Sequence, residues 1–298
     1  MAVEALVAAR PSASPWAEAW RRLRRNPLAM ISLFLIVGLV ILAVFAPWIA
    51  PYAYDEQDRS YAELPAPADS KHRLGVDNLG QDILSRLIFG ARVSLAVGIL
   101  VQAIEVLIGV SMGLLAAYKG GMWDRILMRV TDAMFAFPDL LFAILLVGII
   151  RPESVVGSVL TVFVALAVVG WPGMARLARG QALALREKEY VEAARAIGVS
   201  GWGIVTRHML PNMLSPIIVA VTVSIANTIL AEATLSFLGI GIQPPYPSWG
   251  RMISDARPYI RSEPMLILFP SLMLGITVLA FNFLGDALRD ALDPRLRH

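Results

Sequence analysis

The sequence predicts an all-α integral membrane protein with six transmembrane helices. Hydrophobic residues make up 57% of the 298 residues and charged residues only 16%, whereas a typical soluble protein has about 25% charged residues. Six segments stay apolar over the length of about 20 residues that a helix needs to cross a bilayer. Positively charged residues also gather in alternate connections between these segments, which is typical of multi-pass proteins.

The first predicted span, Leu28–Ala50, contains no charged residue. It is longer than the roughly 7–15 apolar residues of a signal peptide, and no small-residue cleavage site follows it. We therefore expect it to remain in the membrane after a cytoplasmic segment over residues 1–27. Prolines and acidic residues in the following loop, 51–92, predict an irregular extracytoplasmic segment that ends in a turn and a short surface helix.

The other five spans are expected to form one core over residues 93–285, followed by a tail over residues 286–298. Their ranges are Val93–Tyr118, Ala133–Ile150, Val155–Ala175, Ser215–Ile242 and Met265–Gly285. In the third span Pro138 is expected to kink the helix, because proline donates no backbone hydrogen bond. The fifth span has a start signal, since Ser215 can cap a helix and Pro216 suits its first position.

Six spans place both termini on the same side of the membrane. With the N-terminus in the cytoplasm, 17 of the 26 lysines and arginines lie on the cytoplasmic side and 9 lie outside. The positive-inside rule therefore predicts cytoplasmic N- and C-termini. In this orientation the long polar connection between the fourth and fifth spans faces the cytoplasm.

That connection, residues 187–211, predicts an amphipathic helix followed by a turn. Its apolar stripe has the spacing i, i+3, i+4 and i+7 and comprises Tyr190, Ala193, Ala194 and Ile197. The charged residues off the stripe are Glu189, Glu192 and Arg195. Gly198 suits the left-handed position that ends a helix, and Pro211 is expected to break the chain before the fifth span. Periodicity alone leaves open a helix that caps the bundle, an interfacial helix and a docking site.

The same connection matches a family signature. The pattern E-A-A-x3-G-x11-L-P is formed by Glu192, Ala193, Ala194, Gly198, Leu210 and Pro211. It resembles the signature of ABC importer permeases, with His208 where a hydrophobic residue is usual. The stretches "NPLAMISLFLIVGLVILAVFAPWIAPY", "LGVDNLGQDILSRLIFGARVSL", "EATLSFLGIGIQPPYPSWGRMISDAR" and "LGDALRDALDPRLR" resemble the peptide-importer branch. The chain is thus similar to the second, C-type permease subunit of dipeptide/oligopeptide ABC importers.

The resemblance implies a type I ABC importer permease fold in a bacterial plasma (inner) membrane. It implies a coupling helix within residues 187–211 that rests on an ATP-hydrolysing subunit. The residues that would couple to this ATPase are Glu189, Tyr190, Glu192, Ala193, Ala194, Arg195, Ile197, Gly198, Leu210 and Pro211. The implied partners are a sister permease, two ATP-binding subunits and an extracytoplasmic peptide-binding protein, with no nucleic acid.

Sequence motifs for catalysis are absent. The chain contains no G-x-x-x-x-G-K-[ST] phosphate loop, no spacing typical of metal ligands or catalytic triads, and no cysteine. We therefore expect a non-catalytic transport subunit that binds no cofactor and no metal itself. ATP and magnesium would be bound by the partner ATPase subunits.

Polar residues within the predicted spans are Glu105, Asn227 and Glu232. Because such residues are costly in a membrane, they usually line a water-filled path or pair with another group. In the first case they would contact the backbone or amino terminus of passing cargo. In the second they would hydrogen-bond a neighbouring helix or the sister permease. Gly109 and Gly113 are spaced for close packing between helices of this chain.

Two outer segments are candidates for contact with the binding protein, the stretch from Gly75 to Arg86 and the proline-rich loop before Trp249. The candidate residues are Asp77, Asp82, Arg86, Pro245 and Trp249. The alternative interpretation is that both segments are stiff surface loops.

Two alternative functions are left open. The cargo could be nickel or another small solute, since similar permeases carry these. An ion-coupled secondary transporter, from a different class, would use the acidic residues in the spans as relays. The docking signature, and the lack of an evident internal repeat, favour the importer.

Overall fold

The computed structural model describes residues 15–61, 65–150 and 154–293. Residues 1–14 of the predicted N-terminal segment and residues 294–298 of the predicted tail lie outside the described residues. Within the described ranges there is no β-strand, and the strand-like pairings are isolated bridges in the segment 57–82. The prediction of an all-α fold is confirmed.

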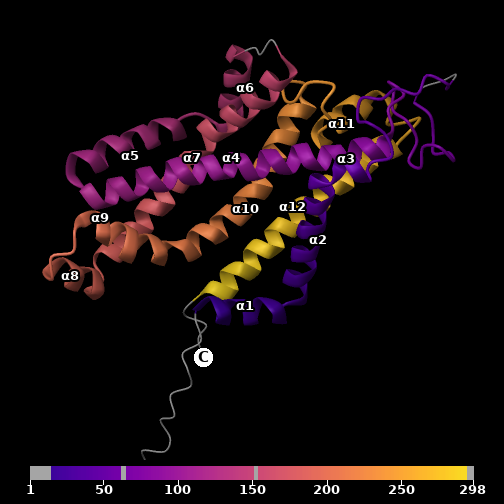
Figure 1. The fold of residues 1–298 in the computed structure, drawn as a ribbon. Helices are drawn as coiled ribbons and strands as arrows, with labels where there is room; N and C mark the ends of the chain where they lie inside the picture. Colours follow the sequence, from indigo (N-terminus) through magenta and orange to yellow (C-terminus); the bar gives the residue numbers. More distant parts are fainter. Residues whose placement is uncertain (1–14, 62–64, 151–153, 294–298) are drawn as a thin grey trace, which may run out of the picture.

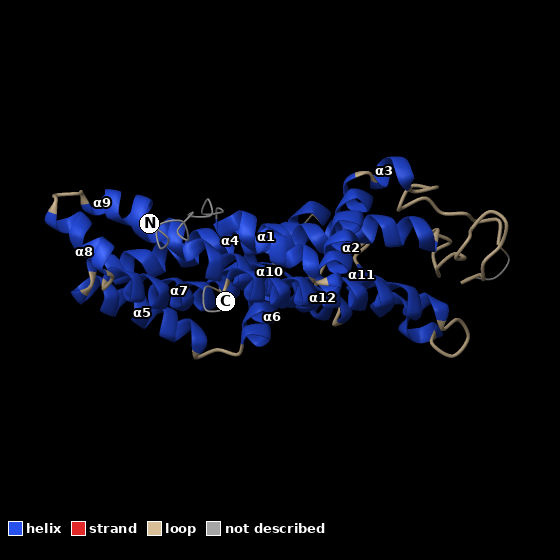
Figure 2. Cartoon of the chain, turned by 90° about the horizontal axis from the view of Figure 1, so that it is seen from below, coloured by secondary structure: helices blue, strands red, loops and turns tan. Residues whose placement is uncertain are grey.

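The chain folds into a bundle of long helices with short helices at its ends (Figure 1). The helices are α1 (Pro15–Arg25), α2 (Pro27–Val44), α3 (Ala46–Ile49), α4 (Ile83–Lys119), α5 (Gly121–Phe135), α6 (Asp139–Ile150), α7 (Val155–Arg186), α8 (Glu189–Ala196), α9 (Gly201–Ile204), the π-helix η2 (Val205–Met209), α10 (Leu210–Phe237), α11 (Trp249–Ala256), the 3-10 helix η3 (Arg257–Tyr259) and α12 (Met265–Leu292). Figure 2 shows α8 and α9 at one end and the loop after α3 at the other.

Five helices of the described chain are long and apolar enough to cross a membrane. They are α2, α4, α7, α12 and the continuous helix Gly201–Phe237, which joins α9, η2 and α10. The third predicted span supplies a sixth crossing only as the bent pair α5 and α6. The two ends of the bundle therefore correspond to the two sides of a membrane.

Residues 136–138 break the third predicted span. α5 ends at Phe135, α6 begins at Asp139, and the two helices are bent by 87°. We predicted a kink at Pro138; the bend lies there, but the helix is interrupted rather than merely kinked. A proline disfavours the helical conformation of the residue before it, here Phe137, and lacks the N–H for the next turn, so the helix stops.

The second and fourth spans are longer than predicted. α4 begins at Ile83 rather than Val93, so the expected short surface helix is the first part of α4. Asp82 caps it, because its carboxylate accepts a hydrogen bond from the backbone N–H of Ser85 at 2.7 Å. α7 continues to Arg186, well past Ala175. At 37 residues, α4 is about 55 Å long and extends beyond a hydrocarbon core of about 30 Å.

The fifth span does not begin at Ser215. The helix is continuous through Pro211 and Pro216, so the predicted break and the predicted start were both wrong. The π-helix before Pro211 absorbs its ring, with the backbone N–H of Leu210 bonded to the carbonyl of Val205 instead of the usual i−4 partner. The second part of the polar connection, from Gly201 onward, and the fifth span therefore form one continuous helix, whereas α8 is a separate helix.

Close packing of α4 on α7 forms the centre of the bundle, as the glycine spacing predicted. A Cβ at Gly109 would lie 2.8 Å from the carbonyl oxygen of Trp171, and one at Gly113 would fall on the carbonyl oxygen of Ala175. Only glycine permits this separation of the two backbones. Away from this centre, α2 packs on α12 and α4. The short helix α1 packs on α12, where it buries Ala19, and much of its surface stays exposed.

Candidate functional site

The polar connection folds as a short helix with a defined end. α8 carries acidic residues in its first turn and Arg195 in its last, which suits the helix dipole. Gly198 has φ of 83°. Its N–H donates to the carbonyl of Arg195 at 3.1 Å, and the N–H of Val199 donates to the carbonyl of Ala194 at 3.0 Å. This Schellman arrangement confirms that Gly198 ends the helix.

One face of α8 packs on the bundle and the other faces outward. Val191 is fully buried and Ala194 is 4% exposed, both in a cluster with residues of α4 and α7. Tyr190 and Ala193 are exposed, and Ile197 is 82% exposed. The predicted apolar stripe, except for Ala194, therefore faces away from the chain. Sequence reasoning missed Val191, although it lies three residues before Ala194 on the inner face.

The exposed stripe of α8 continues into α9. Trp202 is 77% exposed, which is unusual for the largest apolar side chain. Leu210 is half-buried and Pro211 is exposed at the start of α10. The charged residues Glu189, Glu192 and Arg195 are also exposed. The arrangement offers a partner an apolar patch with a charged border.

The α8–α9 element is seated on the end of α4. The hydroxyl of Tyr118 occupies the position where a Cβ of Gly201 would lie. Arg186, at the end of α7, donates from Nη1 to the carbonyl oxygen of Ala117 at 3.1 Å. The α8–α9 element therefore contacts the end of α4 directly, beside the point where α7 is bonded to α4.

Ion pairs tie α5 to α7 near the same end. Arg179 binds both carboxylate oxygens of Asp124, with Nε at 2.6 Å and Nη2 at 2.8 Å. Nη2 of Arg176 lies 2.6 Å from Oδ1 of Asp132. The guanidinium carbon of Arg176 lies 3.9 Å from the ring centroid of Phe135. Because bidentate arginine–carboxylate pairs fix orientation, α5 and α7 are held in one register.

A cavity of about 330 Å³ lies among α4, α6, α7 and α10. Its polar lining comprises Glu105, Asp139, Ser224, Asn227 and Thr228, and the rest is apolar apart from Gly170. Glu105 is 7% exposed, and its carboxylate occupies the space where a Cβ of Gly170 would lie. Two of the three predicted path residues, Glu105 and Asn227, thus share one cavity.

The third predicted path residue lies elsewhere. Glu232 is fully buried between α10, α4 and α11 and does not line the cavity. Ser236 donates its hydroxyl to Glu232 Oε1 at 2.6 Å, and Ser94 donates to Oε2 at 3.4 Å. Ser236 lies one turn later on the same helix and Ser94 on the neighbouring helix α4, so Glu232 bonds within the bundle, as in the alternative interpretation. Asp139 was not among the predicted residues, because its place on the cavity depends on the break at Pro138.

Most of the residues predicted to contact the binding protein are buried. Asp82, Arg86 and Trp249 are buried. The indole Nε1 of Trp249 donates to the carbonyl of Leu87 at 3.2 Å, and Arg86 Nε lies 3.3 Å from Asp77 Oδ2. These side chains hold the outer segments on α4 and do not reach an external partner in this conformation. Pro245 and Asp77 are partly exposed.

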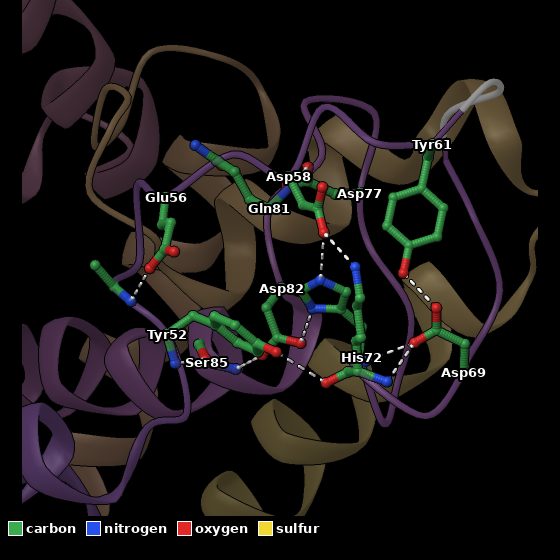
Figure 3. A network of polar contacts seen from close by, with 12 residues as sticks. Tyr52, Glu56, Asp58, Tyr61, Asp69, His72, Asp77, Gln81, Asp82 and Ser85 are labelled. Atoms are coloured by element: carbon green, nitrogen blue, oxygen red, sulfur yellow. Dashed lines mark hydrogen bonds and ion pairs between the residues drawn. The ribbon is translucent and has the colours of Figure 1, made fainter.

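A histidine network organises the loop between α3 and α4 (Figure 3). His72 is 3% exposed, with Nδ1 2.9 Å from Asp82 Oδ1 and Nε2 3.5 Å from Asp58 Oδ2. Hydrogen bonds from Ser60 lower the pKa of Asp58 to about 2. The hydrogen bond to Asp69 raises the pKa of Tyr61 to about 12. Sequence reasoning missed this network, since its members are 8 to 14 residues apart.

Two family models cover most of the chain. Residues 107–298 match the binding-protein-dependent transport system inner membrane component family. Residues 14–67 match the N-terminal transmembrane domain of oligopeptide transport permease C. Both matches agree with the similarity to C-type permease subunits that the sequence motifs indicated.

Curated relatives are similar over nearly the full length. The glutathione transport system permease protein GsiD of Escherichia coli O6:K15:H31 is 44% identical over 284 residues, 95% of this chain and 92% of the relative. The protein of the same name from Shigella boydii serotype 4 is 45% identical with the same coverage.

The fold also has a counterpart among solved structures. A chain of the inward-facing MetNI methionine ABC transporter superposes with a TM-score of 0.56 at 22% identity, over 70% of this chain and 96% of that one. At this identity the match concerns the fold alone. Together with the family matches, it shows that the chain belongs to the binding-protein-dependent transport system inner membrane component family and is a transmembrane permease subunit of an ABC importer.

Proposed function

We propose that this chain forms, together with a sister permease, the membrane path of a bacterial importer for dipeptides or oligopeptides. The observation that carries the proposal is the 330 Å³ cavity between the spans, with its acidic and amide side chains. Its volume is near the lower end of the range for small-molecule sites. The names of the relatives add support, because glutathione is itself a tripeptide.

The α8–α9 element is the proposed contact with an ATP-hydrolysing subunit. Its exposed Tyr190, Ile197 and Trp202 offer the kind of apolar anchors that dominate protein interfaces. Closure of two ATPase subunits would push this element, and the packed helices α4 and α7 would transmit the push to the cavity. The chain itself would bind no cofactor and catalyse no reaction, with ATP and magnesium held by the partners.

The proposed orientation places both termini and the α8–α9 element in the cytoplasm. The excess of lysine and arginine on that side supports it. The opposite end of the bundle would then receive cargo from an extracytoplasmic binding protein. Of the candidate contacts, Pro245 and Asp77 have the exposure that such a contact needs.

The test is uptake by the complete transporter in vesicles. The chain, its sister permease, two ATP-binding subunits and the binding protein are reconstituted, and accumulation of labelled trialanine is measured with and without ATP. We expect uptake that requires both ATP and the ATPase subunits. Uptake driven by an ion gradient without those subunits would overturn the proposal, and accumulation of Ni²⁺ but no peptide would overturn the assignment of cargo.

A further inference from the structure

We propose that the cavity lined by Glu105, Asp139 and Asn227 binds the ammonium group at the amino terminus of a peptide as it crosses the membrane. This inference rests on the proposed function and specifies which part of the cargo the path recognises. The site would take any peptide with a free amino terminus, largely independent of its side chains.

The charge of the cavity is the first observation. It contains two carboxylates, and its lining includes no lysine, arginine or histidine among the described residues. Glu105 forms no ion pair within the described chain and is only 7% exposed. A buried, unpaired carboxylate between apolar spans is costly unless it is protonated or a cation is supplied. A passing ammonium group would supply it.

An unsatisfied amide next to Glu105 is the second observation. Gln102, one turn earlier on α4, is 1% exposed, and neither its Oε1 nor its Nε2 has a hydrogen-bond partner in the described structure. Buried polar atoms without partners are rare in folded proteins, so this amide needs an explanation. Gln102 does not line the cavity itself, but it lies beside Glu105 on α4, so the polar groups behind this wall of the cavity are not saturated by the described chain.

The shape and composition of the cavity select an ammonium group over a metal ion. Calcium requires six to eight oxygen ligands, and the described residues contain no group of three histidines and acids that could hold a metal. An ammonium group needs only three acceptors. The apolar wall, formed by Leu140, Ala143, Leu166, Val169 and Ala231, suits the rest of a small peptide.

Cysteine labelling measures occupancy directly, because the chain contains no cysteine of its own. Ser224→Cys places a near-isosteric thiol in the lining. In the reconstituted complex, the labelling rate of this subunit by a maleimide is measured with increasing trialanine or N-acetyl-trialanine. We expect trialanine to slow labelling and the acetylated peptide, which lacks the ammonium group, to have no effect.

Variants then locate the binding group. Glu105→Gln combined with Asp139→Asn should raise the trialanine concentration for half protection by about tenfold or more, the range of a charge-assisted hydrogen bond. Gly170→Ala should have the same effect, because its methyl group would displace the flexible Glu105 carboxylate. Gly173→Ala is the matched control on the same helix, since a Cβ there meets no atom within 4 Å, and it should retain protection.

The outcomes separate this inference from the function on which it rests. If the wild-type complex takes up trialanine but both peptides protect equally, neither protects, or the double variant keeps full protection, the inference is wrong and the importer function stands. An unreactive Ser224→Cys would likewise show that the cavity is closed to cargo. If the wild-type complex takes up no peptide, the proposed function itself fails.

Discussion

At the scale of single residues, small differences in side-chain volume set the spacing of the central helices. Gly113 contacts α7 so closely that a Cβ would fall on the carbonyl of Ala175 and lie 2.8 Å from the backbone nitrogen of Arg179. The obstructing atoms belong to the backbone and cannot rotate away. The two helices must separate to admit even one methyl group.

Gly113→Ala should therefore destabilise the protein by about 1–3 kcal/mol, the usual cost of overpacking. Gly180→Ala on α7 is the control, because no atom lies within 4 Å of its Cβ position and alanine favours the helix. Thermal unfolding of the purified complex compares the two. Equal melting temperatures for both variants would contradict the packing described for α4 and α7.

The pKa of Asp58, in the loop between α3 and α4, predicts that the stability of the protein depends on pH. Its pKa of about 2 in the folded protein lies below the ordinary value of 3.8. A carboxylate with a depressed pKa contributes stability above its unfolded pKa, and that contribution is lost as the pH falls through the folded value. We expect the difference in melting temperature between wild type and Asp58→Asn to be constant above pH 5 and to shrink from pH 4 towards pH 2. A difference that does not change with pH would refute this.

The features that the sequence predicted best were the glycine that ends a helix and the glycines at a close contact between two helices. Gly198 follows from the need for positive φ at a helix end, and Gly109 with Gly113 follows from spacing. The network around His72 could not be predicted in the same way. Its formation depends on the path of an irregular loop, and no periodicity in the sequence encodes that path.

At the scale of elements, α8 is a small helix with two different faces. Val191 anchors it to the bundle, while Ile197 projects into solvent. Substitutions on the two faces should therefore have different consequences, although both change an apolar side chain to a charged one.

Ile197→Asp should leave the melting temperature of the chain unchanged and weaken binding of the ATPase subunits by about tenfold or more, because exposed apolar anchors carry much interface energy. Val191→Asp should instead destabilise the chain, since it buries an unpaired charge. Binding is measured with purified subunits and stability by thermal unfolding. Unimpaired ATPase binding by Ile197→Asp would show that this face of α8 is not the docking surface.

Prolines show why helix boundaries could not be predicted from sequence. At Pro138 the chain breaks, whereas Pro211 lies inside a continuous helix. The difference is whether the groups that proline leaves unpaired find other partners. Near Pro211 the carbonyl of His208 accepts from the side chain of Asn212 at 2.6 Å, and η2 widens the turn. Such compensation depends on three-dimensional neighbours and is not visible in propensity.

At the scale of the whole molecule, α4 and α7 connect the end of the bundle that carries the α8–α9 element with the cavity. The same α4 helix carries Tyr118 under the α8–α9 element and Glu105 in the cavity wall. Because these residues share one helix, we expect a movement of the α8–α9 element to change the position of the cavity lining. The all-α membrane fold and the family could be predicted from sequence, but the reach of α4 and α7 along the bundle depends on helix lengths that the sequence understated.

The Arg179–Asp124 pair should be essential for transmission rather than for stability. It is partly exposed, so Arg179→Met is expected to change the free energy of unfolding by less than about 1 kcal/mol. It ties α5, and through α5 the cavity-lining α6, to α7. We expect a fall of roughly 2- to 30-fold in peptide taken up per ATP hydrolysed, the range of coupling energies for such contacts. The double exchange Arg179→Asp with Asp124→Arg should restore part of the ratio, because it rebuilds the pair in the opposite sense. If Arg179→Met transports peptide at the wild-type ratio, this ion pair does not take part in transmission.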